Sequence, residues 1–190
     1  MTDDKIVFSV PWFNILERSV SGSDSPYYVL RGNDYVSVLA QTTEGSVPLV
    51  QQYRPAVDAQ TLELLSGHVE EGESPEAAAR RELAEETGYE AETFEHLGTL
   101  APDTGRLSNK LWCYYACRAT QLRSDVAREQ GVQVVRCVQR DMFRQVSEGE
   151  IDHGLTLAVL LLAAVRGRLS VDSISGTRAS VNPAGSPPSE

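Results

Sequence analysis

The segment from Gly67 to Tyr89 constrains this chain more than any other, because a glycine-rich turn leads there into a short helix crowded with glutamates. Ser74 suits the N-cap of that helix, and Pro75 suits its first turn, where the missing N–H would be unsatisfied anyway. Gly88 is placed to end the helix in a left-handed conformation. These signals predict a helix from Pro75 to Thr87.

Like charges are concentrated on one side of this predicted helix. Glu82 faces Glu85 and Glu86 at spacings of three and four residues, and each such pair costs about 0.2–0.5 kcal/mol. Glu85 and Glu86 also lie at the C-terminal end, where the helix dipole disfavours anions by roughly 0.3–1 kcal/mol each. Carboxylate oxygens at this spacing suit Mg²⁺, and the alternative is a solvated acidic helix face.

The spacing of residues around this helix resembles the signature box of the Nudix hydrolases. The pattern is Gly-x5-Glu-x7-Arg-Glu-Leu-x-Glu-Glu-x-Gly-x. The departure is Tyr89, where the family usually has an aliphatic residue, although a tyrosine still packs as a large apolar body. The matching positions are Gly67, Glu73, Arg81, Glu82, Leu83, Glu85, Glu86 and Gly88.

The resemblance implies a divalent metal site within this box. Glu82 and Glu86 are expected as direct ligands of Mg²⁺, with Mn²⁺ as the alternative, and Glu85 is the next candidate ligand. The backbone carbonyl of Ser66, just before Gly67, is expected as a further ligand. Glu85 and Glu86 are therefore also candidate catalytic residues.

Other candidate catalytic residues lie around this metal site. The resemblance implies that Arg81 orients the glutamates by ion pairing, with Glu73 as its partner, and that a late glutamate activates water. Glu129, in the polar loop before residue 132, matches the place of that general base, and the alternative is a solvent-facing loop residue. His153 begins the last predicted helix, where we expect a capping or packing role.

The resemblance extends upstream of the box. Gln52-Tyr53-Arg54-Pro55 followed by Glu63-Leu64-Leu65-Ser66-Gly67 is similar to the branch that cleaves ADP-ribose and other nucleoside diphosphate sugars. Leu65 and Ser66 replace the proline and alanine of that branch. The similarity implies substrate roles for Arg54 and Glu63, and the alternatives are a surface ion pair for Arg54 and an exposed strand position for Glu63.

One loop departs from the ADP-ribose pattern and keeps other substrates open. Pro102 is off register relative to the proline of that branch and is followed by Asp103 rather than glycine. Arg106 in this loop is a candidate substrate-binding residue, and a polar surface loop is the alternative. The leading hypothesis is a nucleoside diphosphate sugar hydrolase; a triphosphate or dinucleotide hydrolase and a non-catalytic nucleotide-sensing module are the alternatives.

Charge and cysteine content restrict the partners and the compartment. The formal net charge of −10 argues against a general nucleic-acid binder, and a polyanionic substrate would need metal ions and local arginines to attract it. The N-terminus lacks a signal-peptide pattern, and no segment is long and apolar enough to span a membrane. An odd count of 3 cysteines favours a reducing compartment, so we expect a cytoplasmic protein.

Alternating runs and turn signals predict an α+β domain. The Nudix resemblance implies an α/β/α sandwich with a mixed central sheet, preceded by N-terminal antiparallel strands. We expect residues 1–39 to form a dimerisation segment of a homodimer, 40–169 the Nudix domain and 170–190 a flexible tail. Strands are predicted at 27–30, 35–41, 47–53, 59–65, 95–100, 111–119 and 132–138, and later helices at 141–148 and 152–166.

Overall fold

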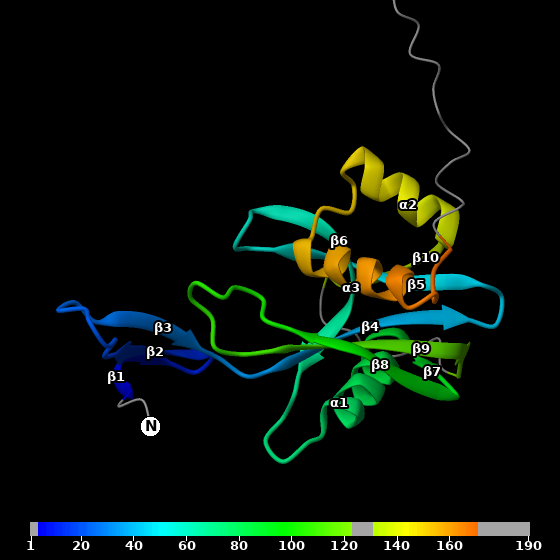
Figure 1. The fold of residues 1–190 in the computed structure, drawn as a ribbon. Coiled ribbons are helices and arrows are strands. Elements are labelled where there is room, and N and C mark those ends of the chain that lie inside the picture. Colours follow the sequence, from blue (N-terminus) through cyan, green and yellow to red (C-terminus); the bar gives the residue numbers. More distant parts are fainter. Residues whose placement is uncertain (1–3, 123–130, 171–190) are drawn as a thin grey trace, which may run out of the picture.

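The computed structural model describes residues 4–122 and 131–170, and it has two parts (Figure 1). The smaller part is an antiparallel sheet in the order β1-β2-β3, which projects from the body of the molecule. The expected N-terminal antiparallel strands are therefore present. Their bounds are Asp4–Val10 for β1, Phe13–Arg18 for β2 and Tyr27–Arg31 for β3.

The larger part is built on a mixed central sheet. Its strand order is β10-β5-β6-β4-β9-β7, with β8 paired to β9, and β4 and β9 run parallel while the other pairs are antiparallel. The mixed sheet implied by the sequence is confirmed. The strands are β4 (Tyr35–Thr42), β5 (Ser46–Arg54), β6 (Ala59–His68), β7 (Tyr89–Glu90), β8 (Thr93–Leu100), β9 (Leu111–Gln121) and β10 (Gln133–Val138).

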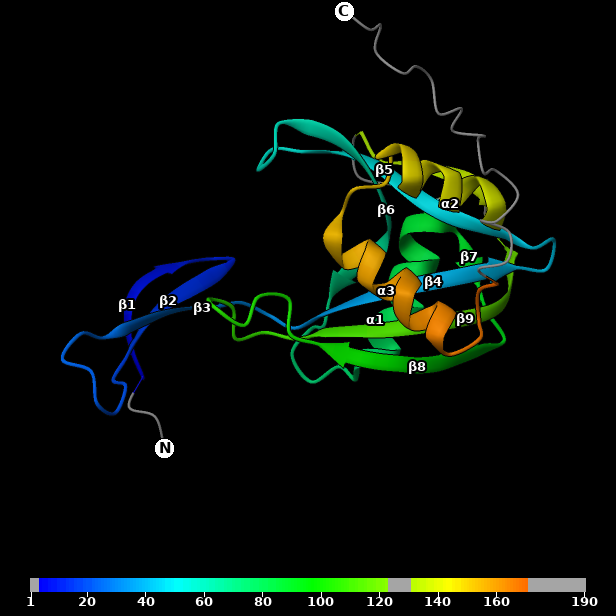
Figure 2. The same cartoon turned by 45° about the horizontal axis from the view of Figure 1, so that its top comes forward.

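Helices cover both faces of this sheet. Helix α1 (Pro75–Glu82) lies on one face, while α2 (Gln139–Glu148) and α3 (Gly154–Val165) lie on the other (Figure 2). Each face has its own apolar cluster, one around Leu83 and Tyr89 and the other around Met142 and Val159. The predicted α+β sandwich is confirmed, and the buried Tyr89 packs as an apolar body as expected.

The box helix begins as the sequence predicts but ends differently. Ser74 accepts a hydrogen bond from the backbone N–H of Ala77, and Gly88 is left-handed with φ of 75°. Between them, the regular helix gives way to a π-helical turn over Leu83–Thr87. The Thr87 hydroxyl donates to the Leu83 carbonyl within this wider turn. Such turns often occur at functional sites, and this one carries Glu85 and Glu86.

The loop before β9 ties the projecting sheet to the body. The N–H of Leu30 donates to the carbonyl of Arg106, and the N–H of Ser108 donates back to the carbonyl of Leu30. Strand β4 at Tyr35–Thr42 already belongs to the central sheet, although the sequence places residues up to 39 with the N-terminal segment. The expected tail lies outside the described residues beyond Ser170.

Candidate active site

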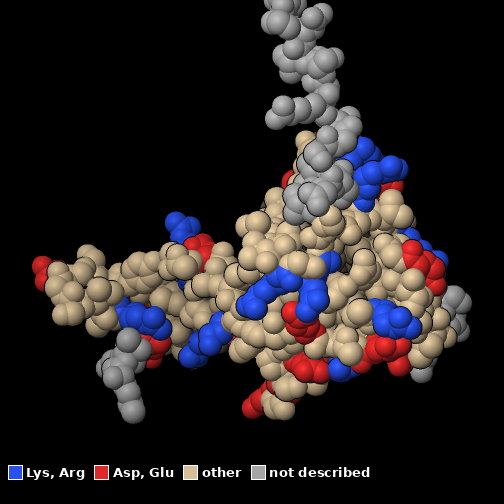
Figure 3. Space-filling model, turned by 45° about the vertical axis from the view of Figure 1, so that its right-hand side comes forward, with Lys and Arg blue, Asp and Glu red and all other residues tan. Residues whose placement is uncertain are grey.

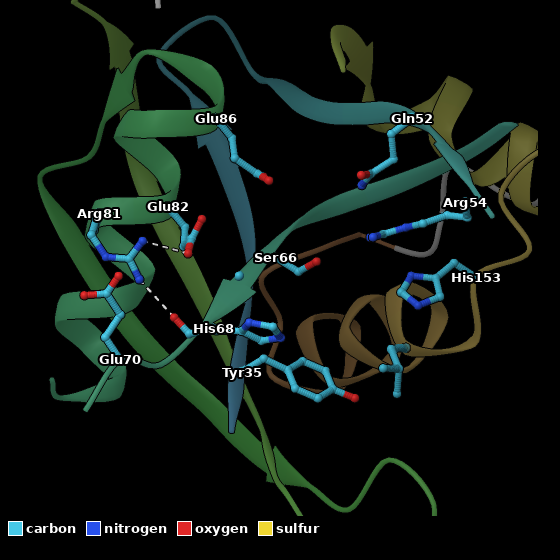
Figure 4. Close-up of a pocket in the computed structure, with 12 residues that line it drawn as sticks. Tyr35, Gln52, Arg54, Ser66, His68, Glu70, Arg81, Glu82, Glu86 and His153 are labelled. Carbon is cyan, nitrogen blue, oxygen red and sulfur yellow. Dashed lines mark hydrogen bonds and ion pairs between the residues drawn. The ribbon is translucent and has the colours of Figure 1, made fainter. Parts of the chain in front are cut away.

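A cavity of about 550 Å³ opens where the ends of β5 and β6 meet the box helix and the start of α3. Figure 4 shows Glu70, Glu82 and Glu86 with Arg81 on one side of it, and Arg54 and His153 on the other. The lining residues are Tyr35, Gln52, Arg54, Ser66, Gly67, His68, Glu70, Arg81, Glu82, Glu86, His153 and Leu155.

Glu82 reaches this cavity because Gly67 has no side chain. Gly67 lies at the end of β6, paired with Val36 of β4, and a Cβ built on it would lie 1.9 Å from both Cδ and Oε1 of Glu82. No real side chain tolerates that distance, so the carboxylate occupies the space that a larger residue would fill. The first position of the box is therefore glycine for a steric reason, because any side chain there would collide with the Glu82 carboxylate.

Arg81 holds together the acidic side of the cavity, here called the acidic wall, to which Glu82 and Glu86 belong. Its Nε donates to Glu73 at 3.1 Å, its Nη1 donates to Glu82 at 2.8 Å and to Glu85 at 3.1 Å, and its Nη2 donates to the His68 carbonyl at 2.9 Å. The bonds to Glu73, followed by those to Glu82 and Glu85, raise the pKa of Arg81, and Arg81 in turn lowers the pKa of Glu73. This geometry suits an arginine that orients carboxylates.

The same wall offers ligands that suit a hard divalent cation. Burial raises the pKa of the Glu82 carboxyl, and its hydrogen bond from Arg81 offsets only part of that effect. Glu86 has a buried carboxylate oxygen, Oε2, and Ser66 lines the cavity nearby. Within the described residues, no group of three or more His, Cys, Asp or Glu side chains is placed to hold an ion. The cavity lining offers the Glu82 and Glu86 carboxylates and the Ser66 backbone, and Mg²⁺ commonly combines one or two carboxylates with waters.

Two of the candidate residues do not line the cavity. The Glu85 side chain is 62% exposed and points to Arg81, and it does not line the cavity. Arg106 lies in the loop that contacts the projecting sheet, also outside the lining. Glu129 falls outside the described residues.

Arg54 and Glu63 form an ion pair beside the cavity in which only the carboxylate is buried. The Arg54 guanidinium donates through Nε and Nη2 to the two carboxylate oxygens of Glu63, at 2.9 and 2.7 Å, and Thr61 donates to the same carboxylate at 2.7 Å. Only 2% of Glu63 is exposed, whereas Arg54 lines the cavity. Burial alone would raise the pKa of Glu63, but the hydrogen bonds from Arg54 and Thr61 outweigh it, and the pKa is lowered.

Sequence reasoning missed several lining residues. The place of Gln52 at the cavity could have been predicted from the sequence. Gln52 lies two positions before Arg54 on β5, and therefore on the same face of the strand. His153 begins α3 as expected, but the structure also places it on the cavity beside Arg54. No local pattern predicts this placement, because it depends on how α3 packs against β6.

Comparison with known sequences identifies the family. The family model described as NUDIX domain matches residues 33–157. The chain belongs to the Nudix family. The match includes the whole box and both strands that carry the Arg54–Glu63 pair, while β1, β2 and β3 lie before it.

Relatives within and near the family include enzymes named for pyrophosphate substrates. The chain is 36% identical over 96 residues to the methanol dehydrogenase activator of Bacillus methanolicus, an alignment that covers 50% of this chain and 52% of that relative. It is 28% identical over 133 residues to the ADP-ribose pyrophosphatase of Bacillus subtilis (strain 168), covering 69% and 72%. The chain thus spans about half the length of the first relative.

A solved structure confirms the Nudix fold. The crystal structure of an ADP compounds hydrolase matches with a TM-score of 0.73 and 19% identity, covering 88% of this chain and 95% of that one. The match covers more of the chain than the family model does.

Charges on the surface are mixed despite the acidic composition. The formal net charge is −10, yet Figure 3 shows blue basic and red acidic side chains interspersed over the face it displays. Basic side chains are therefore present on this face despite the negative net charge. No helix in residues 4–122 or 131–170 has the length and apolar character needed to cross a membrane.

Proposed function

We propose that this Nudix protein hydrolyses the pyrophosphate bond of a nucleoside diphosphate sugar, with ADP-ribose as the first substrate to test. Water attacks one phosphorus, the P–O–P bond breaks, and the products are a nucleoside monophosphate and a sugar phosphate. The similarity to an ADP-ribose pyrophosphatase supports this substrate class.

One observation carries the proposal: a single cavity joins an acidic wall to a cationic wall. Glu82 and Glu86 lie on one side, and Arg54 lies on the other (Figure 4). In phosphoryl transfer, catalysis is mostly positioning and stabilisation of charge on the phosphoryl oxygens. A diphosphate fits such a cavity because it has two anionic groups. One can face a metal ion held by Glu82 and Glu86, and the other can face Arg54.

Glu82 and Glu86, with the Ser66 carbonyl, are the residues proposed to hold Mg²⁺ or Mn²⁺. When bound, such an ion supplies charge neutralisation and a lowered pKa for coordinated water. Arg81 is a positioning residue, since it fixes Glu82 and Glu85 and anchors them to the His68 carbonyl. Glu85 is proposed to act through this ion pair, and Glu129 remains the proposed general base.

The decisive experiment follows ADP-ribose turnover by chromatography in the presence of Mg²⁺. We expect AMP and ribose 5-phosphate from the wild type, and a loss of about 100-fold or more in rate for Glu86→Gln. The matched control is Glu76→Gln on the same helix, where the carboxylate pairs with the exposed Arg80 and lies outside the cavity. Equal turnover by Glu86→Gln and Glu76→Gln would contradict the assignment of Glu86 to the metal-binding side of the cavity.

A different pyrophosphate substrate is the second candidate. The loop with Pro102 and Arg106 contacts the projecting sheet and not the cavity, which leaves the sugar end unassigned. If ADP-ribose is not cleaved, other nucleotide sugars and then triphosphates are tested with the same pair of variants. Failure with all of them would favour a non-catalytic nucleotide-sensing module.

The projecting sheet is proposed to mediate a homodimer. Its strands expose large apolar side chains, and such patches mark interaction surfaces. Light scattering should give twice the chain mass for the wild type and the chain mass for a variant with Phe8→Ser and Trp12→Ser. The exposed side chains include Ile6, Phe8, Trp12, Tyr27 and Tyr28.

A further inference from the structure

We propose that His153 binds the phosphoryl group that lies toward Arg54, as a second hydrogen-bond donor on that side of the cavity. The inference rests on the proposed function, because it assigns one more contact to the same substrate. It concerns a residue for which the sequence indicates only capping or packing.

The ring of His153 lines the cavity and is held by one of its nitrogens. Nδ1 lies 3.0 Å from the Thr156 hydroxyl and 3.5 Å from a carboxylate oxygen of Glu63. Thr156 is itself fixed, since it is buried and accepts a hydrogen bond from the Leu64 N–H at 3.1 Å. With Nδ1 directed to these partners, Nε2 is the nitrogen that remains for a ligand in the cavity.

Glu63 couples His153 to Arg54. Its carboxylate receives two hydrogen bonds from Arg54 and lies beside His153, so one buried anion positions both side chains. Glu63 thereby places the His153 ring on the same side of the cavity as the Arg54 guanidinium, where both can donate to one anionic group. Glu63 is a positioning residue, since only 2% of it is exposed and it does not line the cavity that contains Glu82 and Glu86, although it lines a second cavity of about 550 Å³ with Arg54 and His153.

The position of His153 is complementary to the acidic wall. Figure 4 shows its ring projecting from the start of α3 on the side of Arg54, across the cavity from Glu82 and Glu86. The positive end of the α3 dipole lies at the same place and favours an anion. A diphosphate with one phosphoryl group at the acidic wall thus directs its second toward Arg54 and His153.

Two substitutions separate a substrate contact from a purely structural cap. His153→Asn keeps an amide near the position of Nδ1, so it retains the contact with Thr156, but it lacks the reach of Nε2. His153→Gln extends an amide toward the position of Nε2. A capping role predicts that the Asn variant behaves like the wild type, whereas the proposed role predicts that Asn fails and Gln recovers part of the binding.

The experiment measures KM and kcat for ADP-ribose, together with the melting temperature, for the wild type and both variants. We expect KM of His153→Asn to rise about tenfold, the size of one charge-assisted hydrogen bond, with kcat and melting temperature little changed. The matched control is His96→Asn, because His96 is exposed on β8 and packs against Trp112 outside the cavity. An unchanged KM for His153→Asn overturns the proposal.

Binding of inorganic pyrophosphate in EDTA, followed by calorimetry, tests the same contact without turnover. We expect His153→Asn to bind about tenfold more weakly than the wild type. Absence of binding by the wild type, or equal binding by both proteins, overturns the role of His153. Failure of the wild type to hydrolyse any nucleotide sugar would instead reject the proposed function, and the pyrophosphate result would still decide the contact.

Discussion

The Glu82 carboxylate occupies the space beside Gly67 in which a Cβ would lie, only 1.9 Å from its Cδ and Oε1. Gly67→Ala must therefore displace the carboxylate from the acidic wall. We expect affinity for Mg²⁺ and the rate of ADP-ribose hydrolysis to fall by about 10- to 100-fold, as for other losses of ligand positioning. Gly32→Ala is the control, since its Cβ would meet only the Trp12 carbonyl at 3.6 Å. Equal activity of the two variants would show that Glu82 adapts.

Arg81→Lys should lower both stability and activity. Lysine lacks the planar fork that donates to Glu73, Glu82 and the His68 carbonyl, so the partly buried carboxylates lose bonds. We expect the free energy of unfolding to fall by about 2 kcal/mol and the rate to fall about 10- to 100-fold. Denaturant unfolding and turnover check this, with Arg80→Lys as the exposed control. A wild-type rate in Arg81→Lys would reject the positioning role.

Glu63 should make stability depend on pH in the acidic range. Its pKa in the folded protein is below the ordinary value of 4.5, so its stabilising effect is present above that value and is lost as the pH falls through the folded pKa. Glu63→Gln should lose about 1 kcal/mol at neutral pH, since Arg54 is partly exposed. Melting temperatures measured from neutral pH down through this range should converge for the two proteins. A constant difference would refute the linkage.

Cys113 should resist thiol reagents in the native protein. Burial raises the pKa of its thiol to about 12, and the side chain lies in the apolar cluster under α3. All three cysteines are free, and Cys117 is the half-buried one. Iodoacetamide at mildly alkaline pH, followed by peptide mass spectrometry, should label Cys117 first and Cys113 only after unfolding. Rapid native labelling of Cys113 would indicate that this face of the sheet opens readily.

The helix of the box and its cluster of glutamates could be predicted from the sequence because their interactions are local. Ser74 and Gly88 bound the helix through caps made within a few residues, and Arg81 reaches Glu82 and Glu85 on its own helix. The π-helical turn was not predicted, because it differs from a regular helix by hydrogen bonds that residue spacing does not distinguish. The fold class followed from the family resemblance more than from the pattern of strands.

The sequence by itself determined the family and the acidic cluster, since these depend on short-range spacing. The Arg54 and Glu63 candidates came from the resemblance to enzymes that cleave nucleoside diphosphate sugars. Only the tertiary structure decided that Glu82 lies against Gly67, that Glu63 is buried, and that His153 joins Arg54 at the cavity. The physical reason is that these contacts form when α1 and α3 pack on opposite faces of one sheet. Side chains far apart in the chain then meet at the ends of β5 and β6, which no local pattern encodes.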